Sequence, residues 1–170
     1  FIADEVQTGF CRTGKRFAVE HEGVKPDLLI VGKSLGAGLV PISACIGTRE
    51  VMEVFTPGSH GSTYGGNPLA CAVARDVLKY IAEEKPEETA HDLGEWFQAE
   101  LRAANCAKVK EVRGLGLLIG VEIKAEYGPA YPFCEDLAHH GVLTKDTRSC
   151  TMRIAPPLMI SKQDLAWGLE

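Results

Sequence analysis

One lysine, Lys33, stands where an apolar run meets a glycine-rich loop. The run Leu28–Val31 predicts a fully buried strand, and residues 32–41 after it contain three glycines and end with a proline. A lysine at the end of a buried strand loses its charge readily, and such lysines act as bases or form Schiff bases. The setting indicates base or carbonyl chemistry, with a surface lysine in a turn as the alternative.

Two carboxylates, Asp4 and Glu5, follow the short apolar segment at residues 1–3. If that segment is a parallel strand, Asp4 lies at its carboxyl end, where open α/β sheets bind ligands. Carboxylates at strand ends are also common turn or cap residues. The residue types alone leave both roles open.

A loop rich in glycines and hydroxyl side chains spans residues 57–68 and includes Ser62 and Thr63. Such a loop can bring main-chain N–H groups and hydroxyls close to a phosphate. Asn67 and Pro68 predict that a helix begins directly after it. A phosphate-binding role is therefore possible chemically, and a plain connector is the alternative.

A single arginine, Arg153, lies between the apolar residues Met152 and Ile154 in a predicted short strand. Strand alternation points its side chain away from both neighbours, toward solvent or a cleft. Its guanidinium suits the bidentate recognition of a carboxylate. A surface arginine is the alternative.

A nucleotide-binding loop is a rival interpretation of Gly32-Lys33-Ser34. That motif requires a glycine at the position of Asp27, and the dinucleotide pattern requires one at the position of Pro41. Both requirements fail, so this interpretation is weak.

The composition is that of a globular protein, with 170 residues, 45% hydrophobic residues and a net charge of −5. The acidic balance and the lack of a basic cluster argue against a nucleic-acid surface, and no apolar run is long enough for a membrane span. Six scattered cysteines, none spaced as CxxC, indicate free thiols rather than a disulfide framework or a metal site.

The order of the expected strands and helices that position these residues predicts an α/β protein with two domains. We expect part of a larger α/β domain over residues 1–95 and an incomplete small α+β domain over residues 96–170. Two amphipathic helices join them, with apolar stripes formed by Leu69, Val73, Val77 and Tyr80 or Ile81, and by Leu93, Trp96, Phe97 and Leu101. We also expect strands at residues 142–145 and 152–155. Because the chain begins in a strand and stops in a helix, we expect it to be a piece of a longer protein.

Taken together, these segments resemble class III aminotransferases, the pyridoxal-phosphate enzymes of fold type I. The likeness runs in order through residues 3–10, 12–14, 32–35 and 60–68, and it covers essentially the whole chain. It implies the C-terminal part of that fold: part of the mainly parallel sheet of the large domain, followed by the small C-terminal domain.

The resemblance implies roles for four residues at the cofactor. Lys33 would carry pyridoxal 5'-phosphate and transfer a proton during the reaction. Asp4 would keep the pyridine nitrogen protonated. Val6 would pack on one face of the ring, and Gln7 would bind the oxygen of its 3-hydroxyl group.

The resemblance also implies partners. Ser62 and Thr63 would bind the phosphate of the neighbouring subunit in a homodimer or higher oligomer, and Arg153 would face the substrate pocket. No metal, nucleic acid or membrane is implied. Bacterial members are cytosolic, so a cytoplasmic location is expected, or the mitochondrial matrix in a eukaryote.

Residues 60–69 and 153–158 are similar to those of family members that move the δ-amino group of L-ornithine to 2-oxoglutarate. The products would be glutamate semialdehyde and glutamate. Residues 145–150 are less usual for such members, which leaves acetylornithine and 4-aminobutyrate open as donors. A further alternative is that this chain alone is inactive and serves only as a folded or dimerising piece.

Overall fold

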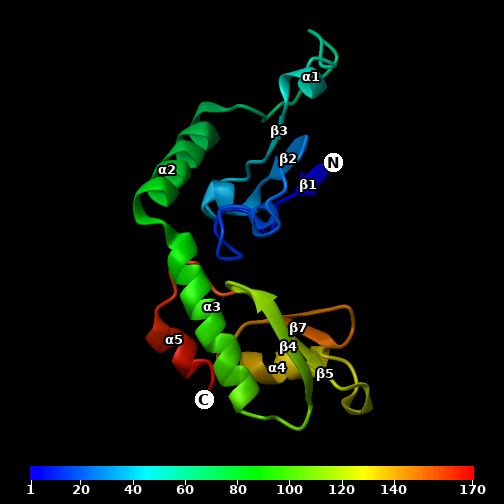
Figure 1. Ribbon diagram of the computed structural model, residues 1–170, viewed down its shortest axis with the longest axis vertical. Coiled ribbons are helices and arrows are strands. Elements are labelled where there is room, and N and C mark those ends of the chain that lie inside the picture. Colours follow the sequence, from blue (N-terminus) through cyan, green and yellow to red (C-terminus); the bar gives the residue numbers. More distant parts are fainter. The chain divides into compact units, whose positions relative to one another are not determined.

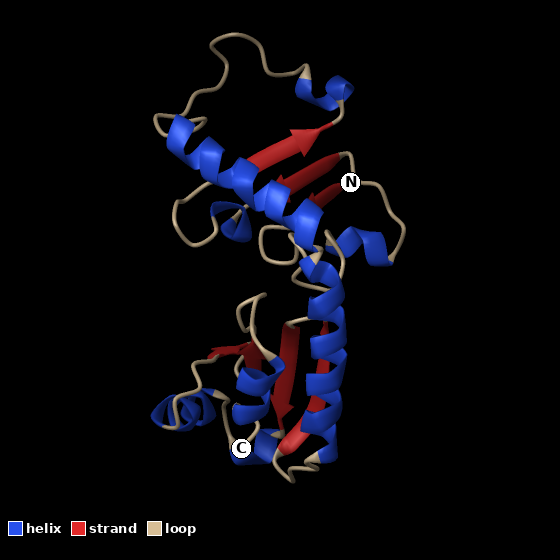
Figure 2. Cartoon of the chain, turned by 90° about the vertical axis from the view of Figure 1, so that its left-hand side faces the viewer, coloured by secondary structure: helices blue, strands red, loops and turns tan.

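The computed structural model describes residues 1–170 and divides them into two compact units (Figures 1 and 2). The first unit consists of residues 1–11 and 15–85, and the second of residues 12–14 and 86–170. The units divide after Lys85, before the expected boundary at residue 95, because helix α3 (Pro86–Ala103) packs with the second unit. Lys85 marks the break between two helices with a left-handed backbone, at φ 47°.

The first unit is a three-stranded sheet with one long helix. In chain order its elements are β1 (Ile2–Asp4), the 3-10 helix η1 (Ala18–His21), β2 (Leu28–Val31), the 3-10 helix η2 (Lys33–Gly36), β3 (Ala44–Gly47), α1 (Arg49–Met52) and α2 (Pro68–Glu84). The sheet order is β1-β2-β3, with β1 parallel and β3 antiparallel to β2. The sheet of this unit is therefore mixed.

Helix α2 begins as the sequence predicts, and its predicted apolar stripe is confirmed in part, with Ile81 buried and Val73 and Val77 half-buried. The side chain of Asn67 accepts a hydrogen bond from the N–H of Ala70 at 2.9 Å, and Pro68 is the first helical residue. The buried residues are Ala70, Ala74 and Ile81, whereas Leu69 is 68% exposed. Small alanine side chains allow the helix to approach its neighbours closely, so Ala70 and Ala74 belong to the buried face and Leu69 does not.

The second unit is an α+β structure whose sheet is antiparallel throughout. Its further elements are β4 (Val109–Leu115), β5 (Leu118–Ile123), the 3-10 helix η3 (Ala125–Tyr127), α4 (Tyr131–His139), β6 (Lys145–Thr147), β7 (Thr151–Ile154) and α5 (Lys162–Trp167). The sheet order is β4-β5-β7-β6.

Strand β6 lies later in the chain than the strand expected at residues 142–145. Thr147 pairs with Thr151, and the turn between them places Arg148 and Ser149 at φ 48° and 62°. Left-handed residues at this position close a tight hairpin, which sets the register of both strands. The pattern of hydrophobic residues could not locate β6, because the turn after it determines which residues pair with β7.

The core of the second unit lies between its helices and one face of the sheet. Ile119, Val121 and Ile123 alternate along β5 and are at most 3% exposed. Helix α3 packs on β4 and β5, and α4 packs on β6 and β7. The predicted stripe on α3 is confirmed, with Phe97 buried and Leu93, Trp96 and Leu101 packed against the core.

Close backbone packing in this unit depends on two glycines. A Cβ atom on Gly94 of α3 would lie 2.1 Å from the main-chain oxygen of Gly116. Gly116 itself has φ 52°, and a Cβ there would lie 2.5 Å from the nitrogen of Gly14. The segment 12–14 joins the unit through this contact and through Arg12, whose guanidinium donates to the carbonyl of Leu117 at 3.2 Å.

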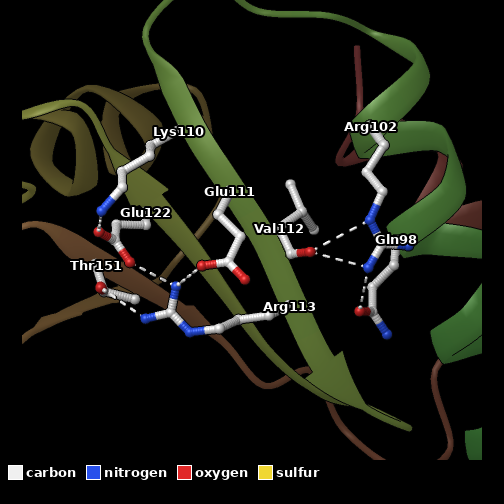
Figure 3. Close-up of polar contacts among 8 residues, drawn as sticks. All are labelled: Gln98, Arg102, Lys110, Glu111, Val112, Arg113, Glu122 and Thr151. Atoms are coloured by element: carbon white, nitrogen blue, oxygen red, sulfur yellow. Dashed lines mark hydrogen bonds and ion pairs between the residues drawn. The ribbon is translucent and has the colours of Figure 1, made fainter.

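The edge strand β4 is covered by α3 (Figure 3). The Nε and Nη2 atoms of Arg102 donate to the carbonyl oxygen of Val112 at 3.2 and 2.9 Å, and Nη2 also donates to the side chain of Gln98. Unpaired groups on a sheet edge invite pairing with other chains. Arg102 satisfies such a group from within the unit.

The face of this sheet away from the core carries a charged network, also drawn in Figure 3. Glu122 accepts from Lys110 and from Arg113, each at 2.6 Å, and Arg113 also pairs with Glu111 at 2.9 Å. Hydrogen bonds from Lys110 and then Arg113 hold the pKa of the Glu122 carboxyl below its ordinary value.

All six cysteines are free thiols, and no helix combines the length and apolar character needed to cross a bilayer.

Candidate active site

The two strongest candidate residues lie at the same edge of the first sheet. Asp4 is the last residue of β1 and pairs with Ile30 of the parallel strand β2. Lys33 follows β2 after a single residue, Gly32, and opens η2. The predicted position of Asp4 at the carboxyl end of a parallel strand is confirmed, and such edges are where open α/β sheets bind ligands.

Lys33 is distinguished by a left-handed backbone conformation and not by a buried side chain. Only Val31 of its strand is buried, at 1% exposure, so the prediction of a fully buried strand is wrong. The side chain of Lys33 is exposed, because the chain turns into η2 immediately after the strand. Its φ of 44° is left-handed, which is unfavourable for a residue with a Cβ atom and concentrates at functional sites.

The same turn overturns the nucleotide-loop interpretation. A phosphate-binding loop of that type delivers its lysine to the start of a helix. Here Lys33 starts a 3-10 helix of four residues that ends at Gly36, with Ala37 left-handed. The local structure does not provide the helix that would hold the phosphates.

The end of β1 and the segment after it place Asp4 and Val6 beside β2, the strand that precedes Lys33. The Asp4 carboxylate accepts a hydrogen bond from the N–H of Val6 at 3.1 Å. The side chain of Val6 lies 3.5 Å from the position that a Cβ on Gly32 would take, so it is next to the residue before Lys33. Gln7 follows and is half-buried.

Lys33 also lines an open hollow of about 1240 Å³ in the first unit. Ser62 lines the same hollow, together with the main chain around Gly61, Gly65 and Gly66. The structure therefore brings Lys33 and Ser62 to one cavity. Asp4, Val6, Gln7 and Thr63 are not part of its lining.

Two hydrogen bonds between residues close in sequence stabilise the loop that carries Ser62 and Thr63. The Ser62 hydroxyl accepts from the N–H of Gly65 at 2.9 Å, and the Asn67 side chain donates to the carbonyl of Tyr64 at 2.8 Å. A hydroxyl that accepts one bond can still donate its own hydrogen to a ligand. Ser62 and Thr63 are both exposed.

Arg153 belongs to the second unit, on β7. It is half-buried and lies opposite Gly120 of β5 and Lys145 of β6. Paired residues of an antiparallel sheet share a face, so Arg153 and Lys145 form a positively charged row on one face of the sheet. This arrangement suits an anionic ligand.

Glu5 is the functional candidate whose importance the sequence did not reveal. Its side chain is 2% exposed, and its carboxylate accepts from the Thr8 hydroxyl and, at 2.9 Å, from the N–H of Val19. The spacing of Glu5 and Thr8 was visible in the sequence, but the contact with Val19 depends on the course of the loop.

A model of the family described as aminotransferase class-III matches residues 1–170. The ornithine aminotransferase of Bacillus subtilis (strain 168) is 51% identical over all 170 residues, which is 42% of its own length. The chain thus spans less than half the length of this relative.

Solved structures of aminotransferases also align with nearly the whole of this chain. An ornithine aminotransferase from Toxoplasma gondii, described with partial occupancy of PLP at its active site, aligns with a TM-score of 0.93 at 45% identity, covering 99% of this chain and 40% of that one. The acetylornithine aminotransferase from Elizabethkingia anophelis aligns at 0.90 and 43% identity, covering 99% and 43%. With its whole length matched by the family, the chain belongs to the class-III aminotransferases.

Proposed function

We propose that the whole protein is a pyridoxal-phosphate-dependent ornithine δ-aminotransferase. It would move the δ-amino group of L-ornithine to 2-oxoglutarate and give glutamate semialdehyde and glutamate. The observation that carries this proposal is the placement of Asp4 and Lys33 at the carboxyl ends of two neighbouring parallel strands, in a chain of this family.

The donor set of the site fits this cofactor. An exposed amine at Lys33 can hold an aldehyde, and a carboxylate at Asp4 can face a ring nitrogen. The hydroxyl of Ser62 and the glycine-rich main chain around it can bind a phosphate, which in the proposed oligomer is that of the neighbouring subunit's cofactor. Val6, Gln7 and Thr63 would complete the contacts. When bound, pyridoxal phosphate supplies an electron-accepting ring that stabilises negative charge on the substrate carbon.

Lys33 has two tasks in this mechanism. Its amine would hold the cofactor, and the free amine would act as the base that removes a proton from the substrate carbon bearing the amino group. An exposed side chain on a strained turn suits both tasks, because the amine must reach the cofactor and then move free of it. Asp4 would hold the proton on the ring nitrogen throughout, since a neighbouring carboxylate favours the charged form.

Arg153 would bind a substrate carboxylate. A guanidinium pairs with a carboxylate through two parallel hydrogen bonds, and the adjacent Lys145 adds a second positive charge on the same face. L-Ornithine and 2-oxoglutarate both carry such a group. Acetylornithine does too, and the likeness to the Elizabethkingia acetylornithine enzyme makes acetylornithine transamination the second candidate.

The partners and location form part of the same proposal. The exposure of Ser62 and Thr63 supports a homodimer or higher oligomer in which one subunit completes the phosphate site of the other. We place the protein in the cytoplasm, or in the mitochondrial matrix if its source is eukaryotic.

The test uses the whole protein that contains this chain. Incubation with pyridoxal phosphate, reduction with borohydride and peptide mass mapping should place the adduct on Lys33. An adduct on another lysine, or none, would contradict the lysine assignment. Glutamate formation from 2-oxoglutarate is then compared for ornithine, acetylornithine and 4-aminobutyrate. Ornithine should give the highest kcat/KM, and a preference for another donor would replace the proposed substrate.

A further inference from the structure

The loop after β1 contains a buried carboxylate with an unusually complete set of partners. Glu5 is 2% exposed, and burying a carboxylate is costly unless donors satisfy its oxygens. One oxygen accepts from the hydroxyl of Thr8, and the other accepts from the N–H of Val19 at 2.9 Å. The carboxylate therefore joins the start of the loop to the first turn of η1.

The main chain of Glu5 makes two further connections. Its N–H donates to the carbonyl of Ile30 at 2.8 Å, on the strand that delivers Lys33. Its carbonyl accepts from the N–H of Gly9 at 3.0 Å, and a Cβ on Gly9 would lie only 2.7 Å from that oxygen. One residue thus connects the loop, the neighbouring strand and η1.

The loop held in this way is strained further along. Phe10 and Cys11 have φ of 54° and 73°, and both are buried, at 4% and 0% exposure. The ring of Phe10 packs edge-on against Phe17 with centroids 5.6 Å apart. Consecutive left-handed residues persist only where surrounding contacts determine their conformation. The Glu5 contacts are of that kind.

We propose that Glu5 is the positioning residue of the cofactor site. Val6 and Gln7 lie between Glu5 and its partner Thr8, and Asp4 directly precedes it. By holding both ends of this short segment, the buried carboxylate keeps the three flanking side chains in the one arrangement that the cofactor needs. This inference rests on the proposed function, and it concerns a residue that does not touch the cofactor.

The test compares variants at Thr8, which disturb the contact without removing a buried charge. Thr8→Val removes the hydroxyl donor, and Thr8→Ser keeps it. Thr89→Val, on the exposed side of α3, is the matched control for loss of a hydroxyl. In the whole protein, Thr8→Val should weaken pyridoxal-phosphate binding about tenfold and shift the pH midpoint of the bound cofactor's absorbance. Thr8→Ser and Thr89→Val should change neither quantity. Wild-type values in Thr8→Val would overturn the proposal.

Glu5→Gln gives an independent check by rescue. The Thr8 hydroxyl can reverse and accept from the new amide, while the amide oxygen still accepts from the N–H of Val19. Cofactor binding in Glu5→Gln should therefore stay within about threefold of wild type, well short of the Thr8→Val loss. A loss as large as that of Thr8→Val would mean that the geometry of these contacts is not what matters.

A measurement without cofactor separates this inference from the proposed function. In the cofactor-free protein, amide hydrogen exchange at Val19 and Gly9 should be about tenfold faster in Thr8→Val than in wild type, and unchanged in Thr8→Ser. Equal exchange in all three proteins would overturn the role of Glu5. If the wild-type protein binds no pyridoxal phosphate, the proposed function fails, and the exchange result still decides whether Glu5 holds the loop.

Discussion

The two units of the chain differ in how they treat their large apolar side chains. The second unit packs Leu117 and Ile119 at 0% and 1% exposure inside one continuous core. That core consists of second-unit residues only. Each unit also leaves large apolar side chains exposed, Leu39 at 76% and Tyr64 at 83% in the first and Leu143 at 89% in the second. Exposed apolar surface on this scale marks places that other parts of a protein or another subunit cover.

This difference suggests that residues of the first unit contribute mainly to catalysis and that the core of the second unit contributes mainly to stability. The unit that carries Asp4 and Lys33 contains five of the eight non-glycine residues with a left-handed backbone, Phe10, Cys11, Lys33, Ala37 and Lys85. The unit that carries Arg153 is closely packed by its own residues. Changes at exposed residues of the first unit should therefore affect activity with little effect on unfolding. Changes in the core of the second unit should mainly lower stability, whereas a change at Arg153, the proposed substrate-binding residue of that unit, should lower activity. Both tryptophans, Trp96 and Trp167, lie in the second unit, so their fluorescence follows the unfolding of that unit.

The largest expected effect is on activity, at Lys33. Lys33→Ala removes the amine that would bind the cofactor and move the proton, so kcat for amino transfer should fall at least about 10³-fold in the whole protein. Because the side chain is exposed, the urea midpoint of tryptophan fluorescence should stay at the wild-type value. Lys15→Ala, also exposed in the first unit, is the control. Retained activity in Lys33→Ala would contradict the assignment.

The largest expected effect on stability is at Gly94. An alanine there would place its Cβ 2.1 Å from the carbonyl oxygen of Gly116, so Gly94→Ala should lower the free energy of unfolding by about 3 kcal/mol. Urea unfolding followed by tryptophan fluorescence measures this. Helix propensity alone predicts the opposite sign, a gain of about 1 kcal/mol. Ala99→Gly, at an exposed position of the same helix, should lose that amount and serves as the reference.

A smaller effect is expected at the covered edge of the sheet. Arg102→Met removes both donors to the Val112 carbonyl and should lower the free energy of unfolding by about 1 kcal/mol. It should also increase self-association, because the edge of β4 is then uncovered. Analytical ultracentrifugation measures the second effect. Gln163→Met, exposed on α5, should cause neither change.

The smallest effect concerns pH and the charged face. The pKa of the Glu122 carboxyl is lowered in the folded protein, so its contribution to stability is present above the unfolded value of about 4.3 and is lost as pH falls through the lower folded value. Glu122→Gln should therefore reduce the drop in urea midpoint between neutral and acidic pH. High salt should reduce the difference between the two proteins. A drop as steep as in wild type would exclude this network as a source of the pH dependence.

Much of the fold could be predicted because local signals were strong. Asn67 and Pro68 marked the start of α2, Ser161 preceded α5, and the β2 residues were identified correctly. The position of β6 could not be predicted, since the left-handed turn at Arg148 sets it. Likewise, the buried stripe of α2 consists mainly of alanines, which carry little hydrophobic signal.

The candidate site was predictable in its residue types but not in its construction. Asp4 and Lys33 could be paired through family motifs, and the parallel pairing of their strands agrees with that. The exposure and left-handed backbone of Lys33 could not be predicted, because they depend on how the chain turns after Gly32. The burial of Glu5 could not be predicted either, because its carboxylate contacts Val19, which lies 14 residues further along the chain.

Residues 12–14 pack with the second unit although the chain on both sides of them belongs to the first. Neither unit is therefore a continuous stretch of sequence. This matters for chimeric enzymes made by recombining relatives. A crossover after Lys85 would transfer Gly94 and Gly116 from one parent but leave their neighbour Gly14 from the other. Hybrids that exchange residues 12–14 together with residues 86–170 should retain the fit between these backbones, and single-crossover hybrids should lose it.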